Sequence, residues 1–433
     1  MELTGSTFIL DNGKLEEISG TFSAGAGIRA LAGGAWGFTI TEDTGEIRKA
    51  IEHASLLAAR TQERTPREKV TLAPVKKPHL RNLPVVKKDP LDVPVEDKIE
   101  LLKDIEKALR IKEVNSTSVT YSEIKARVHY SSSEGVDCEY KSVRVGFAVS
   151  AVAQRNGTYQ ADRESRFSVC GFELFDRYDA REIASEVGGR AVALLDAKAA
   201  KGGEFPVILD PELAGVFIHE AVGHAVEADH VLEGNSILSG KINTQVGSPL
   251  LTAIDDPTLH EYGYYPIDSE GVESRPRVLI ENGVLKSYLH SRETAGKLGG
   301  EPGNARAQSY SKPVVRMSNT FIANGSSTFD EMLLEIRDGV YLIGSRGGQV
   351  NPGEGIFQFN AKRGYMIENG KIAAPLRDVS LSGSTLEILH NVTMVGNDMG
   401  LHSGRCGKAG QLVPVTDGAP HVLVSRAMVG GSG

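Results

Sequence analysis

The sequence predicts an α+β protein built from two domains. Four of the Asn-Gly dipeptides separate segments of alternating apolar and polar residues, and this dipeptide supplies the positive φ angles of a two-residue hairpin turn. Other segments carry apolar residues at the spacing of an amphipathic helix. At 433 residues the chain is long enough for two or three domains. These four dipeptides are Asn12-Gly13, Asn156-Gly157, Asn282-Gly283 and Asn369-Gly370.

We expect residues 1–200 to form an N-terminal α/β domain with antiparallel hairpins and amphipathic helices. A first strand is predicted at residues 7–10. Apolar residues at helical spacing predict helices over 46–64 and 95–111. The segment 65–94 between these helices holds six prolines and two Lys-Lys pairs. This composition predicts an extended, proline-rich connector.

The rest of this domain is predicted to be strands followed by one helix. Alternating patterns run over residues 119–169. A stripe of apolar residues predicts a helix over 179–200, which Lys201-Gly202-Gly203 would end.

Residues 201–433 are expected to form a sheet-dominated C-terminal domain. The segment 206–209 is a short buried strand, Asp210 can cap the helix that follows, and Pro211 suits its first turn. Turns dominate residues 231–319, and a further helix is predicted over 329–337.

The net charge and the amino-acid composition argue against several classes of function. The formal net charge is −8 and no strongly basic segment stands out, which argues against direct binding of nucleic acid. No run of about 18 apolar residues occurs, so we expect no membrane span. The three cysteines, Cys138, Cys170 and Cys406, lie too far apart for a disulfide framework or a Cys-x-x-Cys metal motif. We therefore expect a cytoplasmic protein.

The segment from His219 to His224 reads His-Glu-Ala-Val-Gly-His and carries the chemistry of a metal site. Two imidazoles can ligate zinc, and an adjacent carboxylate, Glu220, can act as a base. On a regular α-helix this spacing would set the two histidines about 140° apart. An i to i+5 turn would bring both rings onto one face, and Gly223 tolerates such a distortion. We therefore predict a π-bulge in this metal-site helix.

A zinc site needs a third protein ligand, and the residues alone leave four candidates open. His230 follows His224 by six residues, as in metzincins, but Glu227 stands where that pattern needs glycine. Cys406 lies in a segment, 402–410, that we expect to be a flexible loop, where Arg405 and Lys408 would favour the thiolate. The candidates are Cys406, His230, Glu227 and Asp229.

A purely structural explanation of these residues is also open. The histidines could satisfy backbone groups within a buried helix. Glu220 argues against this, because a carboxylate between apolar neighbours is costly unless it is paired or used. The segment Gly25–Ala30 matches a loose dinucleotide-binding pattern, but no helix follows it. We interpret it as turns between strands.

Several blocks together resemble the TldD/PmbA family, the modulators of DNA gyrase, over nearly the whole chain. One departure is that family members usually begin with a helix, whereas this chain starts almost directly at its first strand. The blocks are Gly33–Phe38, His219–His224 with Glu227–Asp229, Ile280–Lys286, Gly303–Ala307, Arg316–Thr320, Cys406–Gln411 and Val429–Gly431.

The resemblance implies a zinc-dependent peptidase of the TldD branch, since the PmbA branch lacks the metal motif. It implies that His219, His224 and Cys406 hold Zn²⁺ and that Glu220 is the general base for a metal-activated water. It also implies substrates that are unfolded or flexible peptides, and a homodimer or a heterodimer with a metal-free paralogue. An extended peptide could bind as an added strand.

Two further expectations concern the mechanism. Arg405 is a speculative oxyanion or substrate contact, although a solvated loop charge is the simpler interpretation. The alternative to a peptidase is a non-hydrolytic peptide-binding or regulatory scaffold with a structural metal. An amidase or deaminase is a second rival, but deaminases need a Cys-x-x-Cys pair that is absent here.

Overall fold

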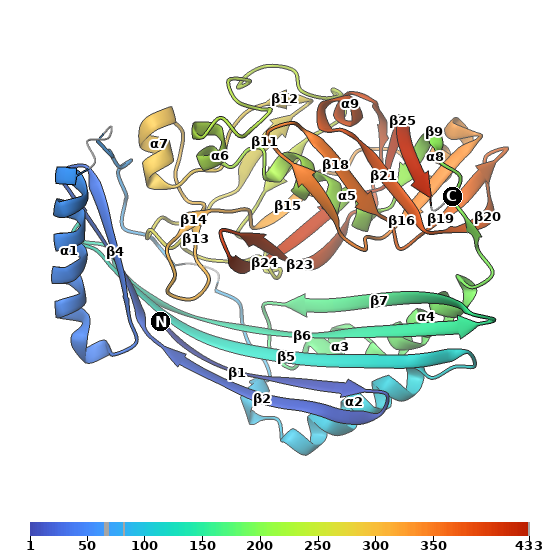
Figure 1. Ribbon diagram of the computed structural model, residues 1–433, viewed down its shortest axis with the longest axis horizontal. Helices are drawn as coiled ribbons and strands as arrows, with labels where there is room; N and C mark the ends of the chain where they lie inside the picture. The colour runs from blue at the N-terminus through green and yellow to red at the C-terminus, as the bar shows by residue number, and fades with distance from the viewer. Residues whose placement is uncertain (65–68, 81–82, 432–433) are drawn as a thin grey trace.

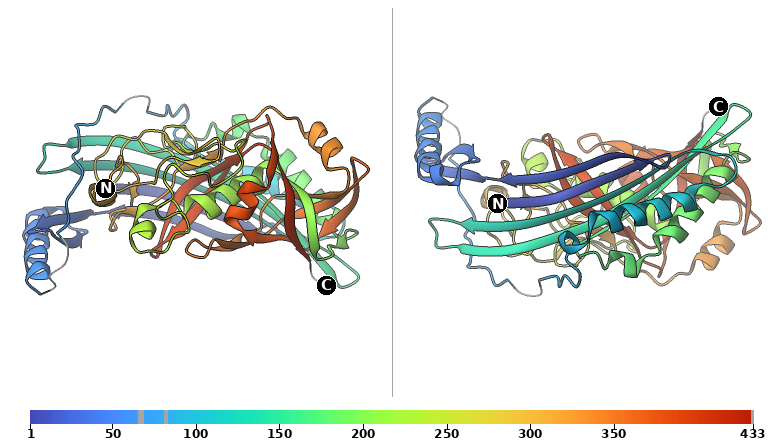
Figure 2. Two further views of the ribbon diagram at one scale, coloured as in Figure 1. Left: turned by 90° about the horizontal axis from the view of Figure 1, so that it is seen from above. Right: turned by 90° about the horizontal axis from the view of Figure 1, so that it is seen from below.

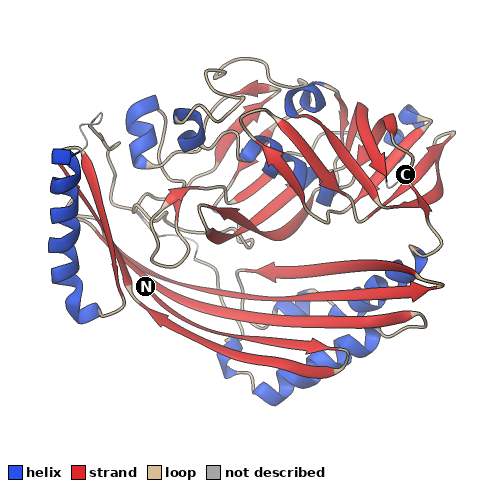
Figure 3. Cartoon of the chain, viewed as in Figure 1, coloured by secondary structure: helices blue, strands red, loops and turns tan. Residues whose placement is uncertain are grey.

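The computed structural model describes residues 1–64, 69–80 and 83–431 and shows two regions stacked face to face (Figure 1). A curved antiparallel sheet with helices on its outer side forms the N-terminal region. Strands and short helices form the larger C-terminal region (Figure 3). The α+β class predicted from the sequence is confirmed.

The N-terminal sheet has five strands in the order β2-β1-β5-β6-β7, all paired antiparallel. Asn12-Gly13 and Asn156-Gly157 join its hairpins with positive φ at both residues, as predicted. Its strands are β1 (Glu2–Asp11), β2 (Lys14–Ala24), β5 (Val114–Ser131), β6 (Asp137–Arg155) and β7 (Thr158–Ser168).

Three helices cover the outer face of this sheet: α2 (Val95–Leu109), α3 (Leu174–Arg177) and α4 (Ala180–Ala193) (Figure 2). Leu102 and Ile105 of α2 pack with Phe147 of β6 in one buried cluster. Asp179 caps α4 through the backbone N–H groups of the first turn. The cluster explains why the apolar stripes of both long helices face inward.

The predicted helix over 179–200 is too long. It ends at Ala193, and the chain then forms β8 (Lys198–Ala199), which pairs in parallel with Leu376 and Arg377. Pairing with the C-terminal sheet satisfies backbone groups that a continued helix would have paired internally. Local apolar spacing cannot report such a distant partner.

An arm made of a β-hairpin and one helix projects at one end of the molecule (Figures 1 and 2). It consists of β3 (Ala26–Ala32), β4 (Ala35–Thr41), a 3₁₀ turn (Thr44–Glu46) and α1 (Ile47–Arg64). Gly37 allows β4 to touch α1, because a Cβ there would overlap with the backbone oxygen of Ala54. Gly25–Ala30 mostly lies within β3, so it forms no nucleotide-binding turn.

The connector predicted over 65–94 contains one 3₁₀ turn (Pro90–Asp92) and otherwise no helix or strand at its described positions, 69–80 and 83–94. Its residues 65–68 and 81–82 lie outside the described part. Backbone atoms of Val70 and Ala73 bond to Gly34 and Arg292. The connector therefore links the arm to the C-terminal region.

The C-terminal region holds a ten-stranded mixed sheet, in the order β17-β18-β21-β25-β9-β16-β19-β20-β8 with β22 paired to β25. Strand β9 contains the predicted segment 206–209 and occupies a central position. Besides β8, whose bounds are given above, the strands of this sheet are β9 (Gly203–Leu209), β16 (Gly339–Ile343), β17 (Gly348–Asn351), β18 (Ile356–Asn360), β19 (Arg363–Glu368), β20 (Lys371–Arg377), β21 (Val379–Ser384), β22 (Val392–Val395) and β25 (Val422–Gly431).

A six-stranded sheet packs beside it in the order β12-β11-β10-β15-β24-β23, and a short ribbon, β13-β14, lies nearby. The pair β15 and β24 is parallel. The strands are β10 (Ala253–Asp255), β11 (Arg277–Glu281), β12 (Val284–Leu285), β13 (Ala305–Arg306), β14 (Val314–Val315), β15 (Asn319–Ile322), β23 (Gly400–Lys408) and β24 (Gln411–Ala419).

Short helices fill the space around these sheets. The largest buried cluster contains Val207 of β9, Ile218 and Val222 of the metal-site segment, and Val415 of β24. The segment that carries the motif is therefore enclosed by both C-terminal sheets. The helices are α5 (Pro211–Phe217), a π-helical turn (Ile218–Gly223), α6 (Ala228–Leu232), α7 (Arg292–Leu298), α8 (Phe329–Ile336) and α9 (Thr385–His390).

Buried ion pairs join the two regions. Lys362 is 5% exposed and its Nζ lies 3.2 Å from Glu164 of β7 and 2.9 Å from Glu212 of α5. Arg29 of the arm contacts Glu270 at 2.6 Å. These paired charges fix the regions relative to each other. No helix within the described residues combines the length and apolar character needed to cross a membrane.

Candidate metal centre

The helix that leads into the site begins where the sequence predicts. Asp210 accepts a hydrogen bond from the backbone N–H of Leu213 at 2.8 Å, and Pro211 occupies the first turn of α5. Asp210 also accepts from the backbone N–H of Gly344 at 2.9 Å. One carboxylate thus anchors the start of α5 to the end of β16.

The predicted π-bulge is confirmed. Ile218–Gly223 forms a π-helical turn, and the N–H of His224 bonds to the carbonyl of His219 at 3.2 Å, which is an i to i+5 contact. The two imidazole rings lie with their centroids 5.4 Å apart. The extra residue in the turn therefore brings both histidines to one side of the helix.

Glycine is required at position 223 because a side chain there would collide with a neighbouring segment. Its φ is negative, so no left-handed backbone requires glycine there. A Cβ at Gly223 would overlap with Sδ of Met317, which is fully buried. The backbone of the π turn is thus in direct contact with the segment before β15, and a larger side chain would separate them.

Cys406 completes a group of three ligating side chains. One ligand atom from each of His219, His224 and Cys406 lies within 4.8 Å of the others. Cys406 Sγ lies 3.5 Å from His224 Nε2, and the cysteine is 5% exposed. The expected flexible loop over 402–410 is wrong, because Cys406 lies in strand β23, which pairs along its length with β24.

Arg405 lies on the opposite face of β23 from Cys406, as alternation along a strand requires. Its side chain lines a cavity beneath the N-terminal sheet together with Arg144 and Arg306. This position argues against Arg405 as an oxyanion donor, and the strand period explains why a sequence neighbour of Cys406 points away from it.

Carboxylates face the outer nitrogen of each imidazole. His224 Nδ1 lies 3.0 Å from Glu227 Oε2 in a hydrogen bond. His219 Nδ1 lies 2.7 Å from Asp417 Oδ1, although the two atoms are not aligned for a hydrogen bond. Such carboxylate partners fix the tautomer that keeps Nε2 unprotonated for a metal. Both rings therefore present Nε2 to the shared centre.

Electrostatics favour a thiolate at Cys406. Burial alone would raise its pKa, but the two neighbouring imidazoles lower the pKa to about 5. Burial opposes protonation of His224, yet Glu227 and the Cys406 sulfur raise the pKa of His224 to about 10. The thiolate is the form that binds metal. The imidazoles supply this effect, whereas the sequence suggested Arg405 and Lys408.

The other three candidates for the third ligand are engaged nearby. Glu227 is fully buried, and Lys408 Nζ lies 3.0 Å from its Oε2 and 2.7 Å from Asp229. Burial would raise the pKa of Glu227, but His224 and Lys408 lower it to about 2. His230 Nδ1 contacts the backbone oxygen of His224 at 3.2 Å. Glu227, Asp229, His230 and Lys408 therefore form a second cluster of polar contacts beside the three candidate ligands.

Glu220 reaches the surface beside the three ligands. Its side chain is 34% exposed, and its Oε2 lies 3.7 Å from His224 Nε2. The apolar neighbours in the sequence suggested a buried carboxylate. The π turn instead rotates Glu220 away from the core that holds Ile218 and Val222. A carboxylate in this position can reach both solvent and the centre of the site.

The donor set fits zinc. Zinc is held at about 2.0–2.3 Å by histidine nitrogen and cysteine sulfur in tetrahedral sites, which places neighbouring ligand atoms roughly 3.5 Å apart. The Sγ to Nε2 distance of 3.5 Å meets this spacing. Three protein ligands with an adjacent carboxylate leave a fourth position for a substrate or water, as in catalytic zinc sites.

Asp417 is the site residue that sequence reasoning missed. It lies near the end of β24, at register with His402 of β23. A lone carboxylate in an otherwise uncharged strand was the available signal, because such a charge is costly unless it is paired. Nothing local, however, connects it to His219, which lies 198 positions earlier in the printed sequence.

Replacing Asp417 by asparagine is expected to lower metal affinity about 10- to 100-fold, because His219 loses the charge that holds its tautomer. A zinc titration against a competing chromophoric chelator measures this. Asp137→Asn is the matched control, since Asp137 faces the exposed His129 at 2.6 Å, far from the site. Equal affinity of the Asp417→Asn variant and the unchanged protein would contradict the role of Asp417.

The fold and the site together define a class: proteins in which two histidines, a cysteine and a carboxylate converge between two sheets as a candidate metal site. Comparison with known proteins specifies the class further. Models of the PmbA/TldA metallopeptidase domains match residues 2–58 (domain 1), 88–195 (central domain) and 202–431 (C-terminal domain). The chain belongs to the PmbA/TldD metallopeptidase family.

Proteins similar to this chain are named metalloproteases. A protein of Archaeoglobus fulgidus named a metalloprotease is 47% identical over 98% of this chain and 96% of its own length. A protein of Saccharolobus solfataricus named a zinc metalloprotease TldD homolog is 36% identical over 73% of this chain and 72% of its own length. The resemblance stated from the sequence is thus confirmed at the level of the family.

Solved structures confirm the fold. A Thermotoga maritima protein, described as a candidate modulator of a DNA gyrase, superposes with a TM-score of 0.84 at 24% identity, covering 99% of this chain and 94% of that one. TldE from Thermococcus kodakarensis gives 0.77 at 19% identity, covering 99% and 96%. At these identities the likeness concerns the fold alone.

Proposed function

We propose that this protein is a zinc-dependent peptidase that hydrolyses unfolded or flexible peptides, with Glu220 as general base. One observation supports it most directly. His219, His224 and Cys406 converge with both Nδ1 atoms facing carboxylates, and Glu220 lies beside them with its side chain partly exposed. A site that only stabilised the fold would have no need of an accessible carboxylate next to the ligands.

His219, His224 and Cys406 would hold a zinc ion, which would supply a Lewis acid to polarise the scissile carbonyl and to make a water molecule more acidic. Glu220 accepts the proton of the attacking water and passes it to the nitrogen of the leaving amine. Asp417 and Glu227 hold the imidazoles, while Lys408 neutralises the buried carboxylate of Glu227. Each residue therefore has a separate task in the reaction.

The alternative is a scaffold that binds peptides around a structural metal without cleaving them. Turnover of an unfolded, fluorogenically labelled protein such as reduced casein distinguishes the two. We expect cleavage that 1,10-phenanthroline abolishes and added zinc restores. Zinc bound at one ion per chain without any cleavage of such substrates would instead support the scaffold.

Flexible peptides are proposed as substrates because a free sheet edge lies next to the site. Strand β17 is the edge of the ten-stranded sheet and approaches the π turn. Its residues are mostly exposed and include Gly348, which adds no side chain. An extended peptide can pair with such an edge through its backbone, which requires little sequence preference.

This mode of binding predicts sensitivity to backbone N-methylation. Methylating alternate amides of a good substrate peptide removes the donors that pair with β17, and we expect KM to rise at least about tenfold. Methylating the intervening amides, which point away from the edge, is the matched control. If both peptides bind as the unmodified one does, strand addition is not how the substrate is held.

We further propose that the protein acts in the cytoplasm as a homodimer or with a metal-free paralogue, without direct contact to nucleic acid. The three cysteines are free, and Cys406 must stay reduced to bind metal. Several large apolar side chains are exposed on β2, among them Phe22 at 77%. Light scattering coupled to gel filtration tests the dimer, and a monomer at micromolar concentration would exclude self-association.

A further inference from the structure

A cavity of about 290 Å³ lies between the N-terminal sheet and the C-terminal region. Strands β1, β5 and β6 form one wall, and β24 with residues 262–269 and 306–309 forms the other. Its volume is near the lower end of small-molecule pockets, roughly 300 Å³. The cavity is separate from the metal centre, because Arg405 lines it while Cys406 faces the other side of β23.

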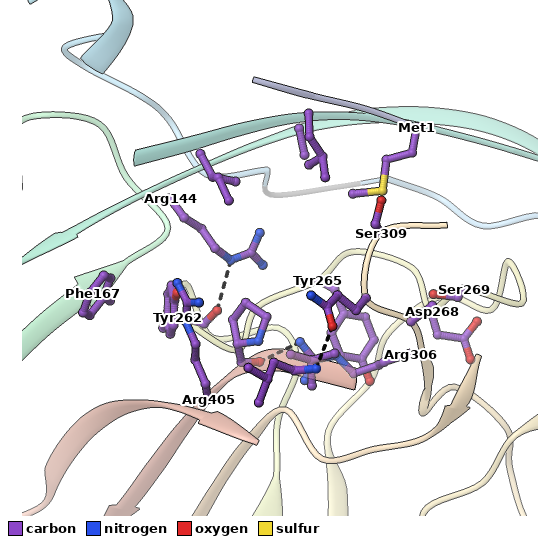
Figure 4. Close-up of a pocket in the computed structure, with 18 of the residues that line it drawn as sticks. Met1, Arg144, Phe167, Tyr262, Tyr265, Asp268, Ser269, Arg306, Ser309 and Arg405 are labelled. Carbon is purple, nitrogen blue, oxygen red and sulfur yellow. Dashed lines mark hydrogen bonds between the residues drawn. The ribbon is translucent and has the colours of Figure 1, made fainter. Parts of the chain in front are cut away.

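Three guanidinium groups surround this cavity. Arg144, Arg306 and Arg405 come from three different parts of the chain (Figure 4). The carboxyl group among the lining residues is Asp268, whose oxygens accept backbone N–H groups of Glu270, Val272 and Ala305. Three guanidinium groups against one carboxyl group leave the described walls with an excess of positive charge.

The partners of the three arginines differ. Arg144 donates to the backbone oxygens of Tyr262 at 3.2 Å and Tyr264 at 2.6 Å, and Arg306 donates to backbone oxygens of Met317 and Pro414. These bonds hold two guanidinium groups in place without neutralising them. Burial lowers the pKa of Arg306 to about 10, although Tyr265 and Asp255 act in the opposite direction.

Arg405 is different, because its side chain is exposed and makes neither a hydrogen bond nor an ion pair within residues 1–64, 69–80 and 83–431. Its side chain extends toward Tyr262 and Arg144 (Figure 4). Ser309 adds a second free group: its Oγ is buried without a hydrogen-bond partner in the described chain, and its φ is +54°. A serine in this conformation has a strained backbone.

The remaining walls are apolar and aromatic. Phe167 and Tyr262 pack at 5.2 Å between ring centroids, and Tyr265 lies 4.9 Å from the Arg306 guanidinium. Ile124 and Leu412 are further apolar residues that line the cavity. An inorganic anion would leave these surfaces without contacts. A ligand that joins one anionic group to an apolar body would satisfy both parts of the cavity.

We propose that this cavity binds a carboxylate attached to an apolar group about the size of one amino-acid residue. Arg405 forms the bidentate contact, since its planar guanidinium matches a carboxylate and has no other partner. Arg144 and Arg306 supply the surrounding positive potential, and the aromatic wall holds the apolar body. A peptide carboxyl terminus and a free organic acid share this chemistry.

Calorimetric titration of the zinc-loaded protein with N-acetyl-phenylalanine tests the site. We expect binding at least about tenfold tighter than that of N-acetyl-phenylalaninamide, because a charged hydrogen bond is lost in the amide. Arg405→Gln should weaken binding of the acid by a similar factor, and Arg405→Glu should abolish it. Arg181→Gln on exposed α4 is the matched control and should change nothing. Equal affinity for acid and amide, or unchanged binding to Arg405→Gln, would overturn the proposal.

A second titration separates this site from the metal centre, since carboxylates also coordinate zinc. After zinc is removed with the neutral chelator 1,10-phenanthroline, binding of the acid should persist. Its loss would place the acid on the metal and overturn the proposal, whatever the peptidase activity shows. A hexapeptide with a free or an amidated carboxyl terminus distinguishes the source: preference for the free terminus indicates a peptide end, and binding of the small acid alone indicates a free metabolite.

Discussion

Glu220→Gln is expected to bind zinc as the unchanged protein does but to cleave peptides at least about 100-fold more slowly, because a positioned general base contributes roughly 10²- to 10⁴-fold. Glutamine keeps the size of the side chain and removes its ability to accept a proton. The side chain is partly exposed and caps no helix, so the fold should tolerate the change. Initial rates on a flexible peptide, with zinc content measured in the same samples, give the answer.

Glu233→Gln is the matched control for this variant. Glu233 is exposed at the end of α6 and contacts none of the metal-binding side chains. Its substitution should leave the rate unchanged. If the Glu220→Gln variant cleaves at the rate of the unchanged protein, Glu220 is not the base, although the metal site could still be correct.

Cys406→Ala is expected to lose zinc and all activity that depends on it. Removing a ligand should reduce affinity by more than the 10- to 100-fold typical of removing a partner outside the ligand set. Elemental analysis of the purified variant beside the unchanged protein measures this. About one zinc per chain in the unchanged protein and almost none in the variant is the expected result.

Two further variants make this result specific. Cys138→Ala removes a half-buried thiol in β6, away from the site, and should retain the metal. Cys406→Asp restores a negatively charged ligand and should recover part of the zinc, which a loss of folding would not allow. A Cys406→Ala variant that keeps one zinc per chain would show that the third ligand lies elsewhere, with His230 the next residue to test.

Because Cys406 is buried beside two imidazoles, its replacement can change the stability of the fold as well as the affinity for metal. Burial opposes protonation of both imidazoles, but in the unchanged protein Asp417 and Cys406 raise the pKa of His219, and Glu227 and Cys406 raise the pKa of His224. Replacing Cys406 by alanine removes one negative partner from each of these buried imidazoles. Thermal unfolding of each variant should accompany the metal analysis, so that lost affinity is separated from lost stability.

Local chemistry in the sequence was enough to predict much of this protein. The hairpin turns predicted at Asn12, Asn156, Asn282 and Asn369 form with positive φ, since only a few residue types adopt that conformation easily. Asp210 and Pro211 begin α5, and the spacing of His219 and His224 required the π turn that is present. These features depend on neighbours within a few residues, which the sequence displays directly.

Tertiary structure decided the features that depend on distant partners. The helix at 179–200 stops at Ala193 because β8 pairs with a strand almost 180 residues later. Cys406 lies in a paired strand, Arg405 points away from the site, and Asp417 faces His219. Burial, charge pairing and strand register arise only when remote segments meet, so periodicity and spacing along the chain cannot specify them.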